Sequence, residues 1–246
     1  MISEQATESG IIELAYQQEP DSVVWSVRTD GLLTTTTYKR EEQVIGWARH
    51  AIGGTDAVVE RIATIPGDLD EDQVYMVVRR TINGATKRYI EFIRDFDFGT
   101  DVTNARFVDS SLTFTGVTST LNGTITNSAT TIALADASAF TSAGAIKIGT
   151  EIITYSGKST NNLTGCTRGV SGDAAAHSSG ATVTQASISL SGLAHLEGQT
   201  VSVLGDGAVH PDVTVSSAAV ALNRYVTKAH VGLSYNSRQQ CRYKPG

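Results

Sequence analysis

The chain has 246 residues, a formal net charge of −6 and only 18% charged residues. This acidic balance argues against a surface that grips DNA through a broad basic patch, although it is compatible with a wall past which DNA slides. On charge alone, an ordinary soluble acidic protein is the interpretation that we favour. The length allows a sizeable core and roughly one to three small domains. Thr, Ser and Gly take the place of the missing charge, and this composition favours β structure with many turns.

Membrane, secretory and metal-binding classes find no support in the sequence. It has no run of about 18 apolar residues that would cross a bilayer as a helix, and its N-terminus is acidic where a signal peptide is basic. We therefore expect no membrane span and synthesis in the cytoplasm. Cys166 and Cys241 form no paired spacing, so neither a disulfide framework nor a zinc site is indicated. We expect Cys166 to be a small buried hydrophobe and Cys241 to be exposed.

The N-terminal half is predicted to be a connector followed by a meander. Residues 1–17 are the connector, with a short helix over 3–17. Residues 18–110 form an antiparallel β meander, typical of a propeller blade or of one sheet of a sandwich. The turns Asp30-Gly31 and Asn83-Gly84 are its strongest signals, because type I′ hairpin turns need positive φ at both central positions. The predicted strands are 22–28, 32–38, 43–50, 57–65, 73–80 and 87–93.

Four cations flank the Asn83-Gly84 turn and are the candidate contact residues for an acidic partner or for passing DNA. The alternative is cross-strand pairing with acidic residues nearby, which exposed hairpins commonly show. The cations are Arg79, Arg80, Lys87 and Arg88, and the acidic residues are Glu91, Asp95 and Asp97.

A second β unit, sandwich-like or barrel-like, is expected from residues 111–118 and 186–236. Between these two stretches, residues 119–185 lose nearly all charge while strand patterns persist, for example on both sides of the two-residue loop Gly149-Thr150. We interpret 119–185 as an inserted small β domain whose termini lie close together. Residues 237–246 lose the apolar alternation and are expected to be an irregular tail. The predicted fold class is therefore mainly β.

Motifs for catalysis and cofactors are missing from the sequence. The five histidines stand in no metal-ligand spacing, and neither a GxSxG motif nor a glycine-rich phosphate loop occurs. The acidic stretch from Asp68 to Asp72 lacks the glycine and the terminal glutamate of a helix–loop–helix calcium site, so we interpret it as a solvated loop. We expect a protein that is not an enzyme and that has no catalytic, cofactor or metal residues.

The order of motifs over 19–93 resembles the tail nozzle (tail tubular) proteins of short-tailed bacteriophages and their prophage relatives. The motifs are EPDSVVW, TYKREEQVIGWARH, VVERIATIPG and VYMVVRRTINGATKRYIEFI, and the resemblance resumes over 191–237. The chain looks like a fragment or a shortened relative, and 119–185 resembles a small β module inserted in phage tail and fibre proteins. The resemblance implies a virion component, made in the host cytoplasm, that self-associates in a ring, conducts DNA and contacts other tail proteins.

Two further functions stay open for the inserted domain. Binding of a host-surface glycan needs aromatic side chains that stack on sugar rings, and the insert offers only Tyr155 and Phe140. A glycan depolymerase needs paired carboxylates in a cleft, and the insert has only Asp136, Glu151 and Asp173. We therefore favour a structural component of a phage tail.

Overall fold

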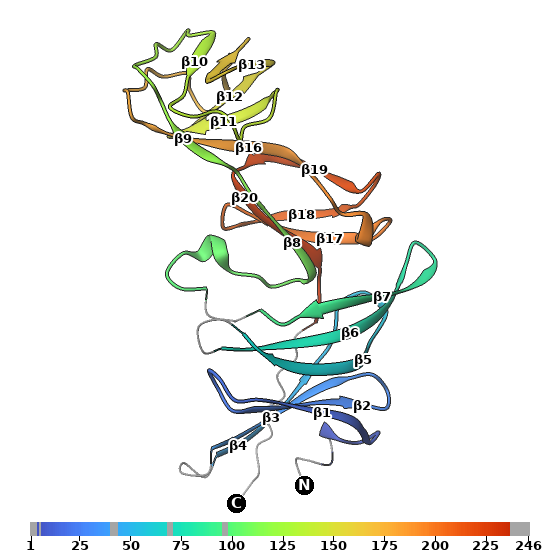
Figure 1. The fold of residues 1–246 in the computed structure, drawn as a ribbon. Helices are drawn as coiled ribbons and strands as arrows, with labels where there is room; N and C mark the ends of the chain where they lie inside the picture. The colour runs from blue at the N-terminus through green and yellow to red at the C-terminus, as the bar shows by residue number, and fades with distance from the viewer. Residues whose placement is uncertain (1–3, 5, 40–43, 68–70, 95–97, 237–246) are drawn as a thin grey trace, which may run out of the picture.

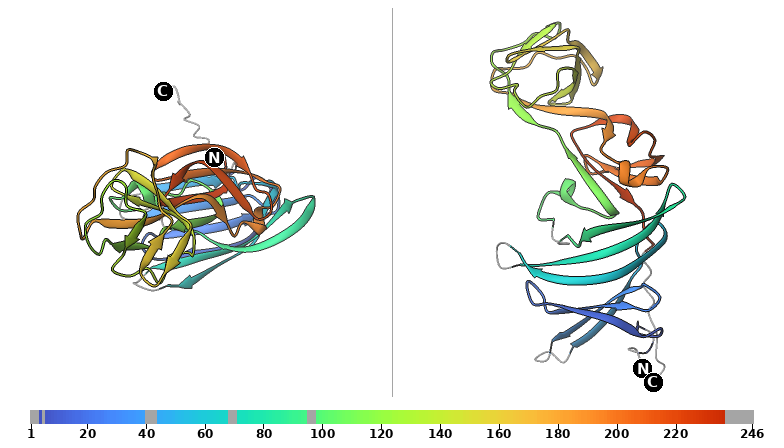
Figure 2. Two further views of the ribbon diagram at one scale, coloured as in Figure 1. Left: turned by 90° about the horizontal axis from the view of Figure 1, so that it is seen from above. Right: turned by 45° about the vertical axis from the view of Figure 1, so that its right-hand side comes forward.

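The computed structural model describes residues 4, 6–39, 44–67, 71–94 and 98–236. The regular structure of this part of the chain is mainly antiparallel β strand, which confirms the predicted fold class. The sheets follow one another along an elongated molecule, with the N-terminal sheet at one end and the strands of residues 118–182 at the other (Figure 1). The same succession is visible in the right-hand view of Figure 2.

The first sheet contains four strands in the order β1-β2-β3-β4. They are β1 (Ile11–Gln17), β2 (Val23–Arg28), β3 (Leu33–Lys39) and β4 (Val44–His50). The helix predicted over 3–17 is wrong for residues 11–17, which are extended and pair with β2. Ala15 packs into the core while Leu14 and Tyr16 are exposed, so a two-residue period governs this segment. Pairing with β2 supplies the backbone hydrogen bonds, and the segment is therefore part of the sheet and not a connector.

The second sheet contains β5 (Thr55–Pro66), β6 (Asp72–Ile82) and β7 (Ala85–Phe92) in this order. It packs on the first sheet through one hydrophobic cluster, which includes Val27 and Leu33 from one sheet and Val59 and Val78 from the other. The two sheets are also joined at an edge, where the N–H of Val59 donates to the carbonyl oxygen of Gly31 at 2.9 Å. This contact occupies part of the β5 edge, which would otherwise be open to another strand.

The two strongest turn signals have different outcomes. Asn83 and Gly84 have φ of 49° and 72°, as the predicted type I′ turn requires, and the turn joins β6 to β7. At Asp30-Gly31 only Gly31 has positive φ, at 80°, so the predicted type I′ geometry is wrong there. A Cβ on Gly31 would lie 2.3 Å from Cβ of Val58. This glycine therefore allows the β2–β3 turn to approach β5.

The C-terminal unit is a four-stranded sheet in the order β18-β17-β20-β8, with β19 packed against it. Its strands are β8 (Asp109–Thr115), β17 (Thr200–Gly205), β18 (Ala208–Thr214), β19 (Ala219–Val226) and β20 (Lys228–Leu233). Two 3-10 turns, η2 (Val102–Asn104) and η3 (Ala194–Leu196), lie in the same part of the chain. β8 is the first strand of this unit and β20 is its last, and the two strands pair with each other.

The segment between these parts has a hydrophobic cluster of its own, from Leu121 to Val183. Its ends are adjacent, because β9 pairs with the first residues of β16. β16 then continues without a break to pair with β19, so one strand belongs to both the insert and the C-terminal unit. The strands are β9 (Thr118–Thr120), β10 (Thr131–Ala133), β11 (Gly144–Ile148), β12 (Glu151–Tyr155), β13 (Gly157–Ser159), β14 (Asn162–Thr164), β15 (Thr167–Ser171) and β16 (Thr182–Ser191).

Candidate functional site

The β6–β7 hairpin divides the four predicted contact residues between its two faces. Arg79 lies opposite Arg88, and Arg80 lies opposite Lys87. Because side chains alternate along a strand, the first pair points to the outer face of the sheet and the second pair to the face that carries the core. The predicted set is therefore not a single patch.

Arg80 is fully buried, with its side chain 0% exposed. Its Nε donates to the carbonyl oxygen of Gly53 at 2.7 Å, and its guanidinium forms an ion pair with both oxygens of Glu91. The N–H of Gly53 donates to the carboxylate of Asp109 at 2.6 Å, and burial raises the pKa of this carboxyl. Through Gly53, Arg80 thus links the hairpin to the first residue of β8 in the C-terminal unit. A contact between Arg80 and a partner is a prediction that the structure does not support.

The alternative of cross-strand pairing is confirmed for Arg80 with Glu91, whereas Asp95 and Asp97 lie outside the described residues. Lys87 is exposed at the end of the same face. A second contact with the C-terminal unit is made by Tyr89, whose hydroxyl donates to the carbonyl oxygen of His195 at 3.1 Å. The core-side face of β7 is therefore used for contacts within the chain.

Arg79 and Arg88, on the outer face, share one carboxylate that the sequence analysis did not single out. Glu60 on β5 accepts from Nε of Arg88 at 2.7 Å and from a terminal nitrogen of the same side chain at 3.1 Å, and it pairs with Nε of Arg79 at 3.2 Å. Hydrogen bonds from Arg88 lower the pKa of Glu60, which in turn raises the pKa of Arg88. Two guanidinium groups on one carboxylate leave a positive charge uncompensated.

The outer face of β5–β7 combines this charge with exposed apolar side chains. Arg61 lies on β5, opposite Val77 of β6, and Arg94 follows β7 and stacks on the ring of Phe92 at 4.8 Å. Against four arginines, the described residues of this face supply the carboxylates of Glu60 and of Asp56, which accepts from Thr81 at 2.9 Å. The large apolar side chains exposed here are Ile65, Ile90 and Phe92, of which Ile90 is 78% exposed. We call this surface the basic apolar face.

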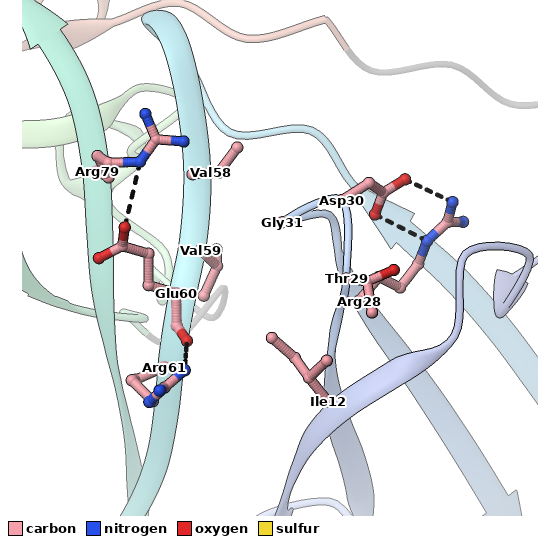
Figure 3. Close-up of a pocket in the computed structure, with 10 residues that line it drawn as sticks. All are labelled: Ile12, Arg28, Thr29, Asp30, Gly31, Val58, Val59, Glu60, Arg61 and Arg79. Carbon is pink, nitrogen blue, oxygen red and sulfur yellow. Dashed lines mark hydrogen bonds and ion pairs between the residues drawn. The ribbon is translucent and has the colours of Figure 1, made fainter.

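A groove of about 480 Å³ lies along the β5 border of this face. One wall carries Arg61 and Arg79, and the other carries Ile12 and the β2–β3 turn (Figure 3). On that second wall Arg28 donates to both oxygens of Asp30, at 3.1 and 2.7 Å, so its charge is matched. The groove therefore extends the basic apolar face towards β1, and the two carboxylates among its described lining residues, Asp30 and Glu60, are each paired with arginine.

The inserted domain contains a buried carboxylate that is fully hydrogen-bonded. Glu151, 1% exposed, accepts from Arg168 through two nitrogens, from Nε2 of His177 and from the backbone N–H groups of Gly169 and Ala175. Burial alone would raise its pKa, but these donors outweigh burial and lower the pKa from 4.5 to about 2. Such a group stays ionised and holds the loop of residues 168–177 in place. Asp136, which caps the turn at Ser138, and the exposed Asp173 do not pair with it.

Aromatic and thiol groups of the insert are likewise interior. Tyr155 and Phe140 are each 3% exposed and belong to the hydrophobic cluster, so neither presents a ring to a sugar. Cys166 is buried in the same cluster, which confirms its predicted role, and burial raises the pKa of its thiol. These three side chains stabilise the insert and do not form a binding site.

The histidines are dispersed, each against a different part of the chain. His230 bridges the Thr113 hydroxyl and the Thr103 carbonyl oxygen, and burial lowers its pKa. Nε2 of His210 accepts from the N–H of Asn223. Among the described residues, the structure contains no group of three side chains able to hold a metal ion and no helix long and apolar enough to cross a membrane.

Comparison of the sequence with protein-family models and with curated proteins finds no match. Matched and unmatched guanidinium groups beside exposed aliphatic side chains suit a partner that is partly acidic and partly apolar.

Proposed function

We propose that this chain is a structural component of a bacteriophage tail, related to the nozzle proteins, which contributes to a ring that conducts DNA and contacts other tail proteins. The observation that carries the proposal is the basic apolar face, which is formed by the same residues, 55–94, that carry much of the resemblance to nozzle proteins. An exposed sheet face of this kind is typical of an interaction surface.

The proposal assigns Arg79 and Arg88 to contact with a protein partner. DNA passes through the ring without sequence-specific binding, and the overall charge of −6 agrees with a wall from which DNA is released easily. Location in the virion tail and synthesis in the host cytoplasm belong to the same proposal.

Glycan binding by the insert is the second candidate, but the burial of Tyr155 and Phe140 removes the stacking surface on which it depended. We therefore keep the structural role as the conclusion.

The test is the solution mass of the purified full chain, measured by light scattering over a range of concentrations. The proposal predicts a discrete multimer with a fixed number of subunits. A monomer at every concentration would contradict a ring that this chain builds by itself. Incubation with duplex DNA is the companion measurement, and tight sequence-specific binding would argue against a conduit.

A further inference from the structure

The first two sheets form a sandwich whose two outer faces are chemically different. The cluster that includes Val27 and Val78 lies between the sheets, so Ile90 and Leu14, which alternate away from it, lie on opposite outer sides. The side formed by β5–β7 is the basic apolar face. On the other side, the N-terminal segment that leads into β1 differs from the basic apolar face in charge.

The N-terminal segment is acidic and carries exposed apolar side chains. Residues 4–22 contain five carboxylates and no lysine or arginine. Glu8 and Glu19 are exposed, and Leu14 and Tyr16 on β1 are 62% and 55% exposed. We call this surface the acidic apolar edge. It complements the basic apolar face, because each surface offers exposed apolar side chains and the net charges of the two surfaces are opposite in sign.

We propose that the basic apolar face binds the acidic apolar edge of a second copy of this chain. The contact is heterologous, since it joins two different surfaces, and each bound copy presents a free edge and a free face to the next copy. Repetition of one such contact closes a ring when the rotation between copies allows it. The inference deepens the proposed function, on which it rests, by naming the two surfaces that meet.

A protein partner fits the basic apolar face better than a nucleic acid does. Glu60 pairs with both Arg79 and Arg88, where its carboxylate would repel a phosphate. The guanidinium of Arg94 covers the Phe92 ring, which would otherwise be a stacking surface for a base. Ile65 and Ile90 add exposed aliphatic area, which favours the apolar part of a protein interface.

The test uses three variants of the full chain: Ile90→Glu on the face, Leu14→Glu on the edge, and Val209→Glu as a control. The control residue is on β18 and is 79% exposed, so it adds the same charge at a comparably exposed site outside both surfaces. All three side chains are exposed, so each variant is expected to unfold at the temperature of the original chain. Sedimentation velocity over a range of concentrations measures association.

We expect Val209→Glu to assemble like the original chain, and Ile90→Glu and Leu14→Glu each to associate at least roughly tenfold more weakly. An equimolar mixture of the two weakened variants is expected to form a 1:1 dimer and nothing larger. In that dimer the intact edge of Ile90→Glu binds the intact face of Leu14→Glu, and no further intact pair is left.

Two outcomes would overturn the inference in distinguishable ways. Assembly of Ile90→Glu and Leu14→Glu at the strength of the original chain would place the contact elsewhere and leave the proposed ring standing. A strict monomer for the original chain and for the mixture would overturn both proposals. Loss of binding to labelled DNA in Ile90→Glu, with assembly unchanged, would identify the face as a nucleic-acid surface and would also reject the inference.

Discussion

Replacement of Glu151 by Gln tests whether this fully hydrogen-bonded carboxylate stabilises the inserted domain. The amide keeps the shape of the carboxylate but loses its charge and turns one acceptor into a donor, which faces the Arg168 and His177 donors. The lowering of the Glu151 pKa from 4.5 to about 2 corresponds to about 3 kcal/mol at neutral pH, at 1.36 kcal/mol per pKa unit. Arg168, whose side chain is only 6% exposed, would also lose its counter-charge.

Hydrogen exchange followed by mass spectrometry resolves this effect, because peptides from 118–182 report on the insert separately from the other sheets. We expect exchange in these peptides to accelerate roughly a hundredfold in Glu151→Gln. The control is Asp173→Asn, an exposed carboxylate of the same domain, for which no change is expected. Acceleration below about fivefold would refute the structural role assigned to Glu151.

The same carboxylate fixes the sign of the acid dependence. Its folded pKa lies below its unfolded pKa, so the stabilisation is complete above about pH 4.5 and is lost as the pH falls towards 2. The insert of the original chain should therefore lose protection in this window. Glu151→Gln should lack this slope, and an equal slope in both proteins would mean that another group titrates.

Three further predictions concern the hairpin, the turn and the thiol. Arg80→Met leaves Glu91 without its buried partner and is expected to lower the free energy of unfolding, measured by chemical denaturation, by about 3 kcal/mol. Arg79 is partly exposed, so Arg79→Met is expected to lower it by about 1 kcal/mol or less. Equal effects of the two variants would contradict the contrast in burial. Gly31→Ala is expected to destabilise the protein clearly more than Gly84→Ala in thermal unfolding. Both glycines have positive φ, but only Gly31 has a close neighbour, Val58. The reverse order of stability would contradict the close approach of the β2–β3 turn to Val58. In a Cys241→Ser background, Cys166 should react with a thiol reagent only as fast as the protein opens, since it is buried and its pKa is raised; rapid reaction in the folded state would show an accessible thiol.

Local pattern was sufficient to predict most strands. Alternating apolar residues between turn residues place β2 to β7 within one or two residues of the predicted runs, and the Asn83-Gly84 hairpin forms as expected. The sequence predicts a helix over residues 11–17 because Ile11, Ile12 and Leu14 fit a partly helical period. Their strand pairing depends on β2, which a local pattern does not include.

The candidate surface was predictable only in part. Opposite faces for Arg79 and Arg80 follow from strand alternation, but the burial of Arg80 depends on Gly53 and Asp109, which are distant in sequence. Glu60 was missed because a register shift between Val59 and Arg61 interrupts the pairing of β5 with β6, and such a bulge has no clear sequence signal here. The sequence also does not predict that β16 runs through the expected domain boundary at 185–186. Its first half pairs with β9 of the insert and its second half with β19 of the C-terminal unit, and neither pairing has a local signal.

The proposed assembly of this chain is a closed ring, and electron microscopy of the assembled full chain images it directly. We expect top views of one size with a central opening, in which the insert projects away from the contact between the sandwich faces. Two-fold dimers, open filaments or isolated monomers as the main species would contradict it.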